Sequence, residues 1–106
     1  YIHVVDLARG HLAALEKLNE APGFVTYNLG SGEGHSVMDV ITAFEKANNL
    51  SIPYSLGKRR AGDIPVSYTN PALAQSELGW KAELSIEEIC RDAWNWQSRN
   101  PDGYDS

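Results

Sequence analysis

One loop of the sequence gathers side chains that could bind a phosphorylated ligand. Residues 58–63 read KRRAGD, so three cations, a flexible glycine and one carboxylate follow one another. A guanidinium presents a planar fork of donors that matches phosphate oxygens, and a nearby carboxylate can accept hydrogen bonds from ribose hydroxyls. The loop therefore suits a nucleotide diphosphate, whereas the alternative is a solvated turn, since most charged runs lie at the surface.

Two other segments resemble cofactor or catalytic motifs without completing them. Residues 30–34 (GSGEG) follow a predicted strand, and bare backbone amides at such a place attract phosphate. The dinucleotide pattern G-x-G-x-x-G would need glycine at His35, so we interpret the segment as a tight turn, with a substrate contact as the alternative. Tyr54 and Lys58 match Y-x-x-x-K, but a preceding proline and an interposed glycine disfavour the helix that would bring them together.

The remaining reactive side chains form no site by their spacing. The three histidines have no ligand spacing, so we expect no metal site. The tryptophans and Tyr104 could form a stacking platform, but in an acidic chain we interpret them as packing. Cys90 is the single cysteine and lies in an apolar helical pattern, which argues against disulfides and favours a reducing, cytoplasmic setting.

The hydrophobic pattern predicts four helices that position these loops. They are expected over residues 4–18, 36–48, 71–78 and 85–99. Ser36 with Asp39, and Ser85 with Glu88, have the spacing of capping boxes, in which the hydroxyl and the carboxylate satisfy free backbone amides at a helix start.

Two short apolar segments predict strands. Residues 24–29 (FVTYNL) and 52–56 (IPYSL) are rich in β-branched and aromatic residues and end near glycine. The order helix, strand, helix, strand, helix, helix predicts an α/β fold with a short parallel strand pair and about four helices. Two strands are few for a sheet that stands by itself.

Length and composition indicate one small folded domain that spans residues 1–106. Hydrophobic residues make up 42% and charged residues 22%, which is ordinary globular usage. The formal net charge of −5 disfavours nucleic acid and anionic membrane as partners, and no apolar run is long enough to span a bilayer. The chain opens on Tyr1 rather than on Met, so we expect its boundary to cut through a larger protein.

Six motifs, taken in order, resemble those of the UDP-galactose 4-epimerases, which are extended short-chain dehydrogenases. They lie at residues 1–11 (YIHVVDLARGH), 27–37 (YNLGSGEGHSV), 59–63 (RRAGD), 78–80 (LGW), 92–97 (DAWNWQ) and 100–104 (NPDGY). The resemblance covers essentially the whole chain, and the closing motifs at 92–104 distinguish it from extended short-chain dehydrogenases at large.

The resemblance implies a C-terminal substrate-binding portion that lacks the Rossmann domain. In that family a homodimeric cytoplasmic enzyme of galactose metabolism inverts C4 of UDP-glucose or UDP-galactose through a 4-keto sugar, using NAD. The NAD and the catalytic Tyr-Lys pair would belong to the missing N-terminal domain, so no catalytic residue and no bound cofactor are expected here. The portion alone is expected to be inactive, and it could self-associate through exposed apolar faces.

Matching the motifs residue by residue gives this chain a set of substrate-binding residues. Arg60 would bind the diphosphate, Asp63 the uridine ribose, and Tyr1 and Val37 the nucleotide end of the pocket. Ser67 would abut the hexose, and its small side chain predicts that UDP-N-acetylhexosamines are also accepted. Ala61 departs from the family pattern, in which an acidic residue is frequent at this position.

Two alternatives to an epimerase portion remain open. The chain could be a truncated binding or interaction module without catalysis, which a reading frame starting near Tyr1 would favour. It could also belong to another nucleotide-sugar dehydrogenase, such as a dehydratase or a uronate epimerase, although residues 92–97 argue against this.

Overall fold

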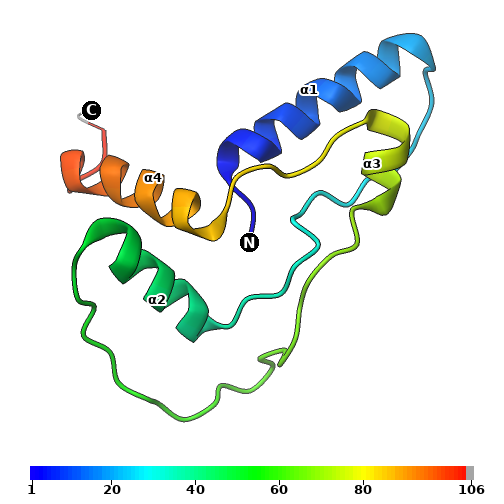
Figure 1. The fold of residues 1–106 in the computed structure, drawn as a ribbon. Helices are drawn as coiled ribbons and strands as arrows, with labels where there is room; N and C mark the ends of the chain where they lie inside the picture. The colour runs from blue at the N-terminus through cyan, green and yellow to red at the C-terminus, as the bar shows by residue number, and fades with distance from the viewer. Residues whose placement is uncertain (105–106) are drawn as a thin grey trace.

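Residues 1–104, which the computed structural model describes, form four α-helices joined by long extended segments (Figure 1). The helices are α1 (Val4–Glu20), α2 (Val37–Asn48), α3 (Ala72–Leu78) and α4 (Ile86–Arg99). Helix α2 packs against α4, and α1 contacts α3. The radius of gyration is 17.0 Å, whereas a compact domain of this size has about 13 Å. The chain is therefore an open assembly of two helix pairs rather than a shell around one core.

The four helices and both capping boxes confirm the sequence prediction. Ser36 Oγ accepts the Asp39 N–H at 3.0 Å, and the Asp39 carboxylate accepts the Ser36 N–H at 2.7 Å. Ser85 and Glu88 repeat this reciprocal pair at the start of α4. The hydrogen bond from the N-cap backbone N–H stabilises the ionised carboxylate, so the pKa of Asp39 and that of Glu88 are lowered.

The predicted strand pair is wrong, because the described residues contain no strand at all. Residues 24–29 and 52–56 are extended but have no ladder partner. The Ile52 N–H donates to the Glu45 side chain at 2.7 Å instead of to another strand, and Phe24 is 93% exposed. Apolar and β-branched side chains favour a strand, but a strand also needs a neighbouring strand that accepts and donates its backbone hydrogen bonds. Within residues 1–104 the fold is therefore all-helical rather than α/β.

A small buried core holds α2 and α4 together. Ala43 and Cys90 are buried between the two helices, and Phe44 meets Trp94 edge to face with ring centroids 6.0 Å apart. Asn48 adds a bridge, because its side-chain amide donates to the Cys90 carbonyl oxygen at 3.2 Å. These contacts fix α2 and α4 as one unit, and α2 lies in the chain between the two loops that carry the candidate site.

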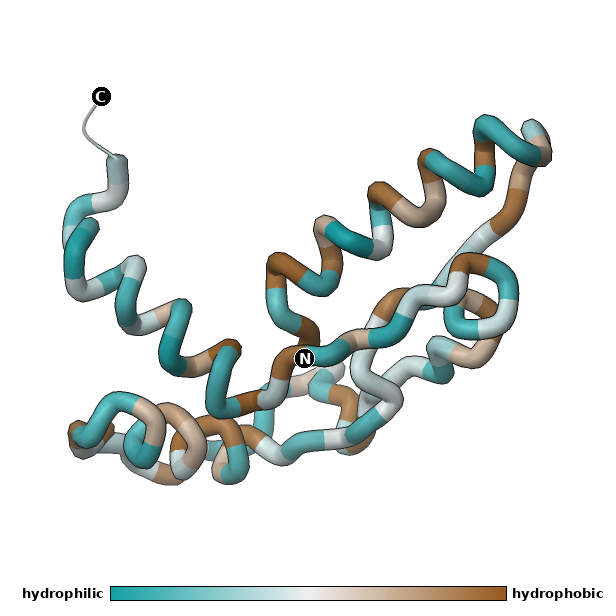
Figure 2. The backbone as a smooth tube through the Cα atoms, turned by 45° about the horizontal axis from the view of Figure 1, so that its top comes forward, coloured by the Kyte–Doolittle hydropathy of each residue, from teal (hydrophilic) through white to brown (hydrophobic). Residues whose placement is uncertain are grey.

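Helix α1 leaves most of its apolar face uncovered by the described residues. Apolar residues recur along the whole helix (Figure 2), and those on this face include Val4, Leu12, Leu15 and Leu18, all of which are exposed. The opposite side is closely packed, since a Cβ on Gly10 would lie 2.6 Å from the Leu29 side chain and 3.3 Å from Trp80. None of the helices formed by residues 1–104 combines the length and apolar character that a bilayer crossing would need.

Candidate functional site

The loop of residues 58–63 brings Arg60 and Asp63 into direct contact. Arg60 Nη2 lies 3.3 Å from Asp63 Oδ1, and Arg60 Nε donates to Asp63 Oδ2 at 3.4 Å. The Asp63 N–H also points back to the Arg60 carbonyl oxygen at 3.4 Å, so the four residues form a turn. Gly62 has a φ of +88°, a conformation that a residue with a side chain rarely adopts. The glycine therefore lets an arginine and a carboxylate three residues apart face each other.

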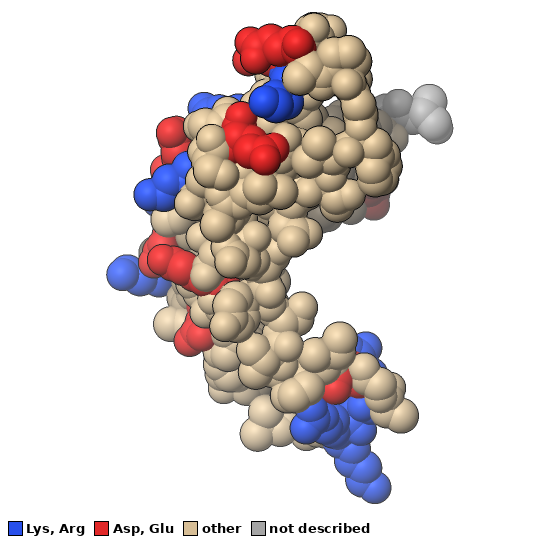
Figure 3. Space-filling model, turned by 90° about the vertical axis from the view of Figure 1, so that its right-hand side faces the viewer, with Lys and Arg blue, Asp and Glu red and all other residues tan. Residues whose placement is uncertain are grey.

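The basic side chains of this loop project from one end of the molecule. Figure 3 shows blue side chains gathered at the lower end, which is the part of the chain that the long loop between α2 and α3 occupies in Figure 1. The Arg60 side chain is 87% exposed. An exposed ion pair of this kind is weak, about 0–1 kcal/mol, because water screens both charges. The Arg60 guanidinium is thus available to a stronger anion at little cost.

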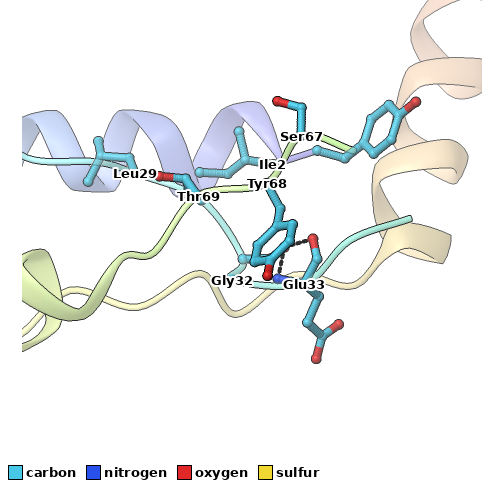
Figure 4. Close-up of a pocket in the computed structure, with 10 residues that line it drawn as sticks. Ile2, Leu29, Gly32, Glu33, Ser67, Tyr68 and Thr69 are labelled. Carbon is cyan, nitrogen blue, oxygen red and sulfur yellow. Dashed lines mark hydrogen bonds between the residues drawn. The ribbon is translucent and has the colours of Figure 1, made fainter. Parts of the chain in front are cut away.

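A separate cavity of about 250 Å³ contains two of the other predicted site residues (Figure 4). Tyr1 and Ser67 both line it, together with Ile2, residues 29–33 and residues 68–69. In Figure 4 the Tyr68 ring points toward Gly32 and Glu33, whereas the Ser67 hydroxyl points the opposite way. The two neighbours thus present their side chains to opposite sides of the extended segment. A bulky residue at Ser67 would project away from the glycine loop, and one at Tyr68 would project onto it.

The predicted residues fall into two groups and one outlier. Arg60 and Asp63 are paired, and Tyr1 and Ser67 share the cavity, whose lining includes neither Arg60 nor Asp63. Val37 is the first residue of α2 and is exposed, and it does not line this cavity either. The structure therefore pairs Arg60 with Asp63 and brings Tyr1 and Ser67 to one cavity, and it leaves Val37 out of both groups.

The N-terminal segment that begins with Tyr1 is anchored at its third residue by a buried histidine to which the sequence assigned no role. His3 is 4% exposed, and its Nδ1 accepts the Val5 N–H at 3.1 Å, which caps the start of α1. Because Nδ1 is an acceptor, Nε2 carries the proton and donates to the Asp92 carboxylate at 3.0 Å. This bond joins the first residues of the chain to α4, next to Tyr1 and Ile2, which line the cavity.

A fully buried carboxylate makes a second connection from the same helix turn. Asp6 is 0% exposed, and its Oδ2 accepts the N–H groups of Glu83 and Leu84 at 3.0 and 2.9 Å. Its other oxygen has no hydrogen bond and lies 3.5 Å from an Arg9 guanidinium nitrogen. The Asp6 carbonyl oxygen accepts the Trp80 indole N–H at 2.9 Å. Asp6 therefore ties α1 to the segment between α3 and α4.

The glycine loop and the α2 N-terminus do not fit a dinucleotide. A Cβ on Gly30 would overlap the Thr69 side chain, and Gly32 has a φ of +78° against Pro71, so packing and turn geometry explain these glycines. The helix start that would receive a pyrophosphate already holds the Asp39 carboxylate. A second anion there would meet like charge, so residues 30–39 are not a binding site for the phosphates of NAD.

Neither the cysteine nor a metal cluster adds reactive chemistry within the described residues. Burial of the Cys90 thiol, with a smaller effect from Glu87, raises its pKa, which keeps the sulfur protonated and unreactive. No group of three or more His, Cys, Asp or Glu side chains in residues 1–104 is arranged to hold a metal ion. The arrangement can bind an anion and hydrogen-bond a polar ligand.

Comparison with known proteins relates the chain to one enzyme family. No protein-family model matches it. It is 56% identical to the UDP-glucose 4-epimerase of Haemophilus influenzae over 104 residues, covering 98% of this chain and 31% of the relative. The human UDP-glucose 4-epimerase is 54% identical over 104 residues, with 98% and 30% covered. The chain therefore spans less than a third of the length of these relatives.

Solved structures agree with the sequence comparison. The UDP-glucose 4-epimerase from Bifidobacterium longum in complex with NAD+ and UDP is 49% identical, with a TM-score of 0.90 over 98% of this chain and 31% of that one. The enzyme from Stenotrophomonas maltophila, with bound NAD and formylated UDP-arabinopyranose, is 45% identical, with a TM-score of 0.91 over 93% and 30%. The resemblance that the motifs predicted is confirmed: over nearly its whole length, this chain is related in sequence and structure to one segment of the UDP-glucose 4-epimerases.

Proposed function

We propose that this chain supplies the UDP-sugar-binding face of a UDP-glucose 4-epimerase, as the C-terminal portion, residues 1–106. The protein that contains it would interconvert UDP-glucose and UDP-galactose by inverting C4 of the hexose. The observation that carries the proposal is a TM-score of 0.90 and 49% identity to an epimerase whose structure holds UDP. At this identity the backbone and the position of loop residues are expected to be shared, and function follows from the site that they form.

The roles proposed for individual residues agree with their chemistry. Arg60 would leave Asp63 to bind the diphosphate with two parallel hydrogen bonds, and Asp63 would then accept hydrogen bonds from the uridine ribose. The contact between them in the free chain supports these two neighbouring roles, because it places both side chains at the same loop tip. Tyr1 and Val37 would line the nucleotide end of the ligand, and Ser67 the hexose.

NAD is proposed as the cofactor of the whole protein, bound outside this chain. Three solved UDP-glucose 4-epimerases that are similar to this chain all contain NAD. Residues 30–39 do not fit its pyrophosphate, because the Asp39 carboxylate already occupies the helix start that follows the glycines. The cofactor would supply the redox chemistry of the inversion, and this chain would bind and orient the sugar nucleotide. We therefore assign no catalytic residue to it.

Removing one guanidinium tests the binding proposal. We expect Arg60→Ala to weaken UDP about 10- to 100-fold, because a hydrogen bond to a charged group contributes about 1.5–3 kcal/mol. Uridine, which has no phosphate, should bind both proteins alike. Calorimetric titration of the protein with UDP, UDP-glucose and uridine measures this, and Lys58→Ala in the same loop is the matched control. Equal UDP affinity in the Arg60→Ala protein and the unaltered protein would refute the assignment.

The finer proposals concern substrate range and assembly. Ser67 lines the cavity and is small, so we propose that UDP-N-acetylhexosamines are accepted. Turnover of UDP-N-acetylgalactosamine should fall in Ser67→Tyr while turnover of UDP-galactose persists, and equal rates in both proteins would end this idea. We also propose that the whole protein is a cytoplasmic homodimer, as the resemblance implies.

A further inference from the structure

Two adjacent arginines of the loop engage different atoms of the same aspartate. Arg60 contacts the Asp63 carboxylate, as described above, whereas Arg59 Nη2 donates to the Asp63 main-chain carbonyl oxygen at 3.3 Å. Lys58, the third cation, makes no hydrogen bond or ion pair with any residue in the range 1–104. The three cations of the KRRAGD loop are therefore not equivalent, although the sequence presents them as one basic cluster.

The Arg59 contact holds the backbone of the turn rather than a charge. It joins the Arg59 side chain, just before the turn, to the main chain of Asp63 at the end of the turn. Within the turn, the Asp63 N–H donates to the Arg60 carbonyl oxygen at 3.4 Å. The flanking residues are exposed throughout residues 53–68, so packing from other elements does not restrain this tip. With so little burial, local hydrogen bonds decide how often Arg60 and Asp63 face the same side.

We propose that Arg59 is a positioning residue for nucleotide binding: it fixes the turn that presents Arg60 and Asp63, and does not itself contact the ligand. The inference rests on the proposed function, because positioning has a measurable effect only if Arg60 binds the diphosphate. It differs from a direct phosphate contact in one respect. A positioning residue acts through Arg60, so its contribution disappears when Arg60 is removed, whereas two independent contacts add.

A double-mutant cycle with UDP as the probe separates these roles. The variants are Arg59→Gln, Arg60→Ala and the pair together, with Lys58→Gln as the matched control, because it removes one cation beside the same turn. We expect Arg59→Gln to weaken UDP about three- to tenfold, the effect of one lost hydrogen bond. Lys58→Gln should change affinity by less than about twofold at physiological salt. In the Arg60→Ala background, Arg59→Gln should have no further effect.

The outcomes distinguish the two proposals. If Arg60→Ala binds UDP as tightly as the unaltered protein, the proposed function is wrong. If Arg60→Ala weakens binding but the Arg59→Gln loss adds fully to it, or equals the Lys58→Gln loss, only the positioning role is wrong. Thermal unfolding should be the same for all variants, because none of the three side chains is buried. Non-additive loss at an unchanged unfolding temperature supports the proposal.

Discussion

From the ion pair between Arg60 and Asp63 we predict that one substitution changes the binding affinity of two ligands in opposite directions. In the free chain the Asp63 carboxylate is paired with the Arg60 guanidinium that would bind the diphosphate, with contacts of 3.3 and 3.4 Å. Asp63→Asn removes the charge while it keeps the size of the side chain. The change releases Arg60 from competition and also removes the proposed acceptor for the ribose hydroxyls.

The two effects have different sizes. Both side chains are exposed, so breaking the pair costs the protein no more than about 1 kcal/mol, and an anion that needs only Arg60 gains up to that amount, about fivefold in affinity. Hydrogen bonds from ribose hydroxyls to a carboxylate contribute about 1.5–3 kcal/mol, and the released Arg60 offsets up to about 1 kcal/mol of their loss, so UDP should bind about 2- to 150-fold more weakly. Inorganic pyrophosphate has no ribose, and it should bind slightly more tightly.

Calorimetric titration with UDP and with pyrophosphate, at low and at physiological salt, measures both effects on the same protein. The pyrophosphate gain should shrink as salt rises, because screening weakens exposed charges, whereas the UDP loss should persist. If Asp63→Asn weakens the two ligands equally, Asp63 does not contact the ribose. If it changes neither, the loop does not bind the nucleotide.

Two further predictions concern stability. Asp6→Ala should lower the free energy of unfolding by about 2–4 kcal/mol in urea denaturation, because it leaves two N–H groups between α3 and α4 without an acceptor. The control Glu16→Ala, on the exposed side of α1, should change the free energy of unfolding by less than about 0.5 kcal/mol. Similar losses in the two variants would show that the buried carboxylate does not hold the segment. The capping boxes predict acid sensitivity. The pKa of Asp39 and that of Glu88 are lowered in the folded chain, chiefly by a backbone hydrogen bond, so their stabilisation is complete above the ordinary values of 3.8 and 4.5 and is lost as pH falls through the lowered values. The combined Asp39→Asn and Glu88→Gln protein should therefore lose less stability on acidification than the unaltered protein, and parallel pH profiles would contradict this.

Local patterns predicted the helices well because each signal acts within a few residues. The boxes at Ser36 and Ser85 mark the starts of α2 and α4 one residue before the first helical position, and Gly79 ends α3 with a φ of +60°. At the start of α3, the Asn70 side chain accepts the Ala72 N–H at 3.0 Å. These contacts need no distant partner, so composition and spacing are sufficient to find them.

The prediction of strands was wrong because a strand, unlike a helix, depends on a distant partner. Residues 24–29 have the composition of a buried strand, yet Tyr27 donates its hydroxyl to the Glu77 carboxylate at 2.6 Å while Phe24 points into solvent. A strand is defined by the partner that receives its backbone hydrogen bonds, and sequence composition does not supply that partner. The same limit applies to the face of α1, which is apolar by pattern and exposed in the described residues.

The candidate site was predictable only where its contacts are short in sequence. Arg60 and Asp63 are three residues apart, so their approach could be expected from a glycine-containing turn. The bond from His3 to Asp92 spans 89 residues, and no spacing rule finds such a pair. Both residues lie in motifs that supported the resemblance, and in the structure this bond joins the first of those motifs to the one in α4.

The most direct test of the account is the structure of the protein with UDP bound. We predict that the Arg60 guanidinium leaves Asp63 and lies within about 3 Å of diphosphate oxygens, with the Asp63 carboxylate at the same distance from the ribose hydroxyls. UDP bound elsewhere, with Arg60 and Asp63 still paired in solvent, would contradict it.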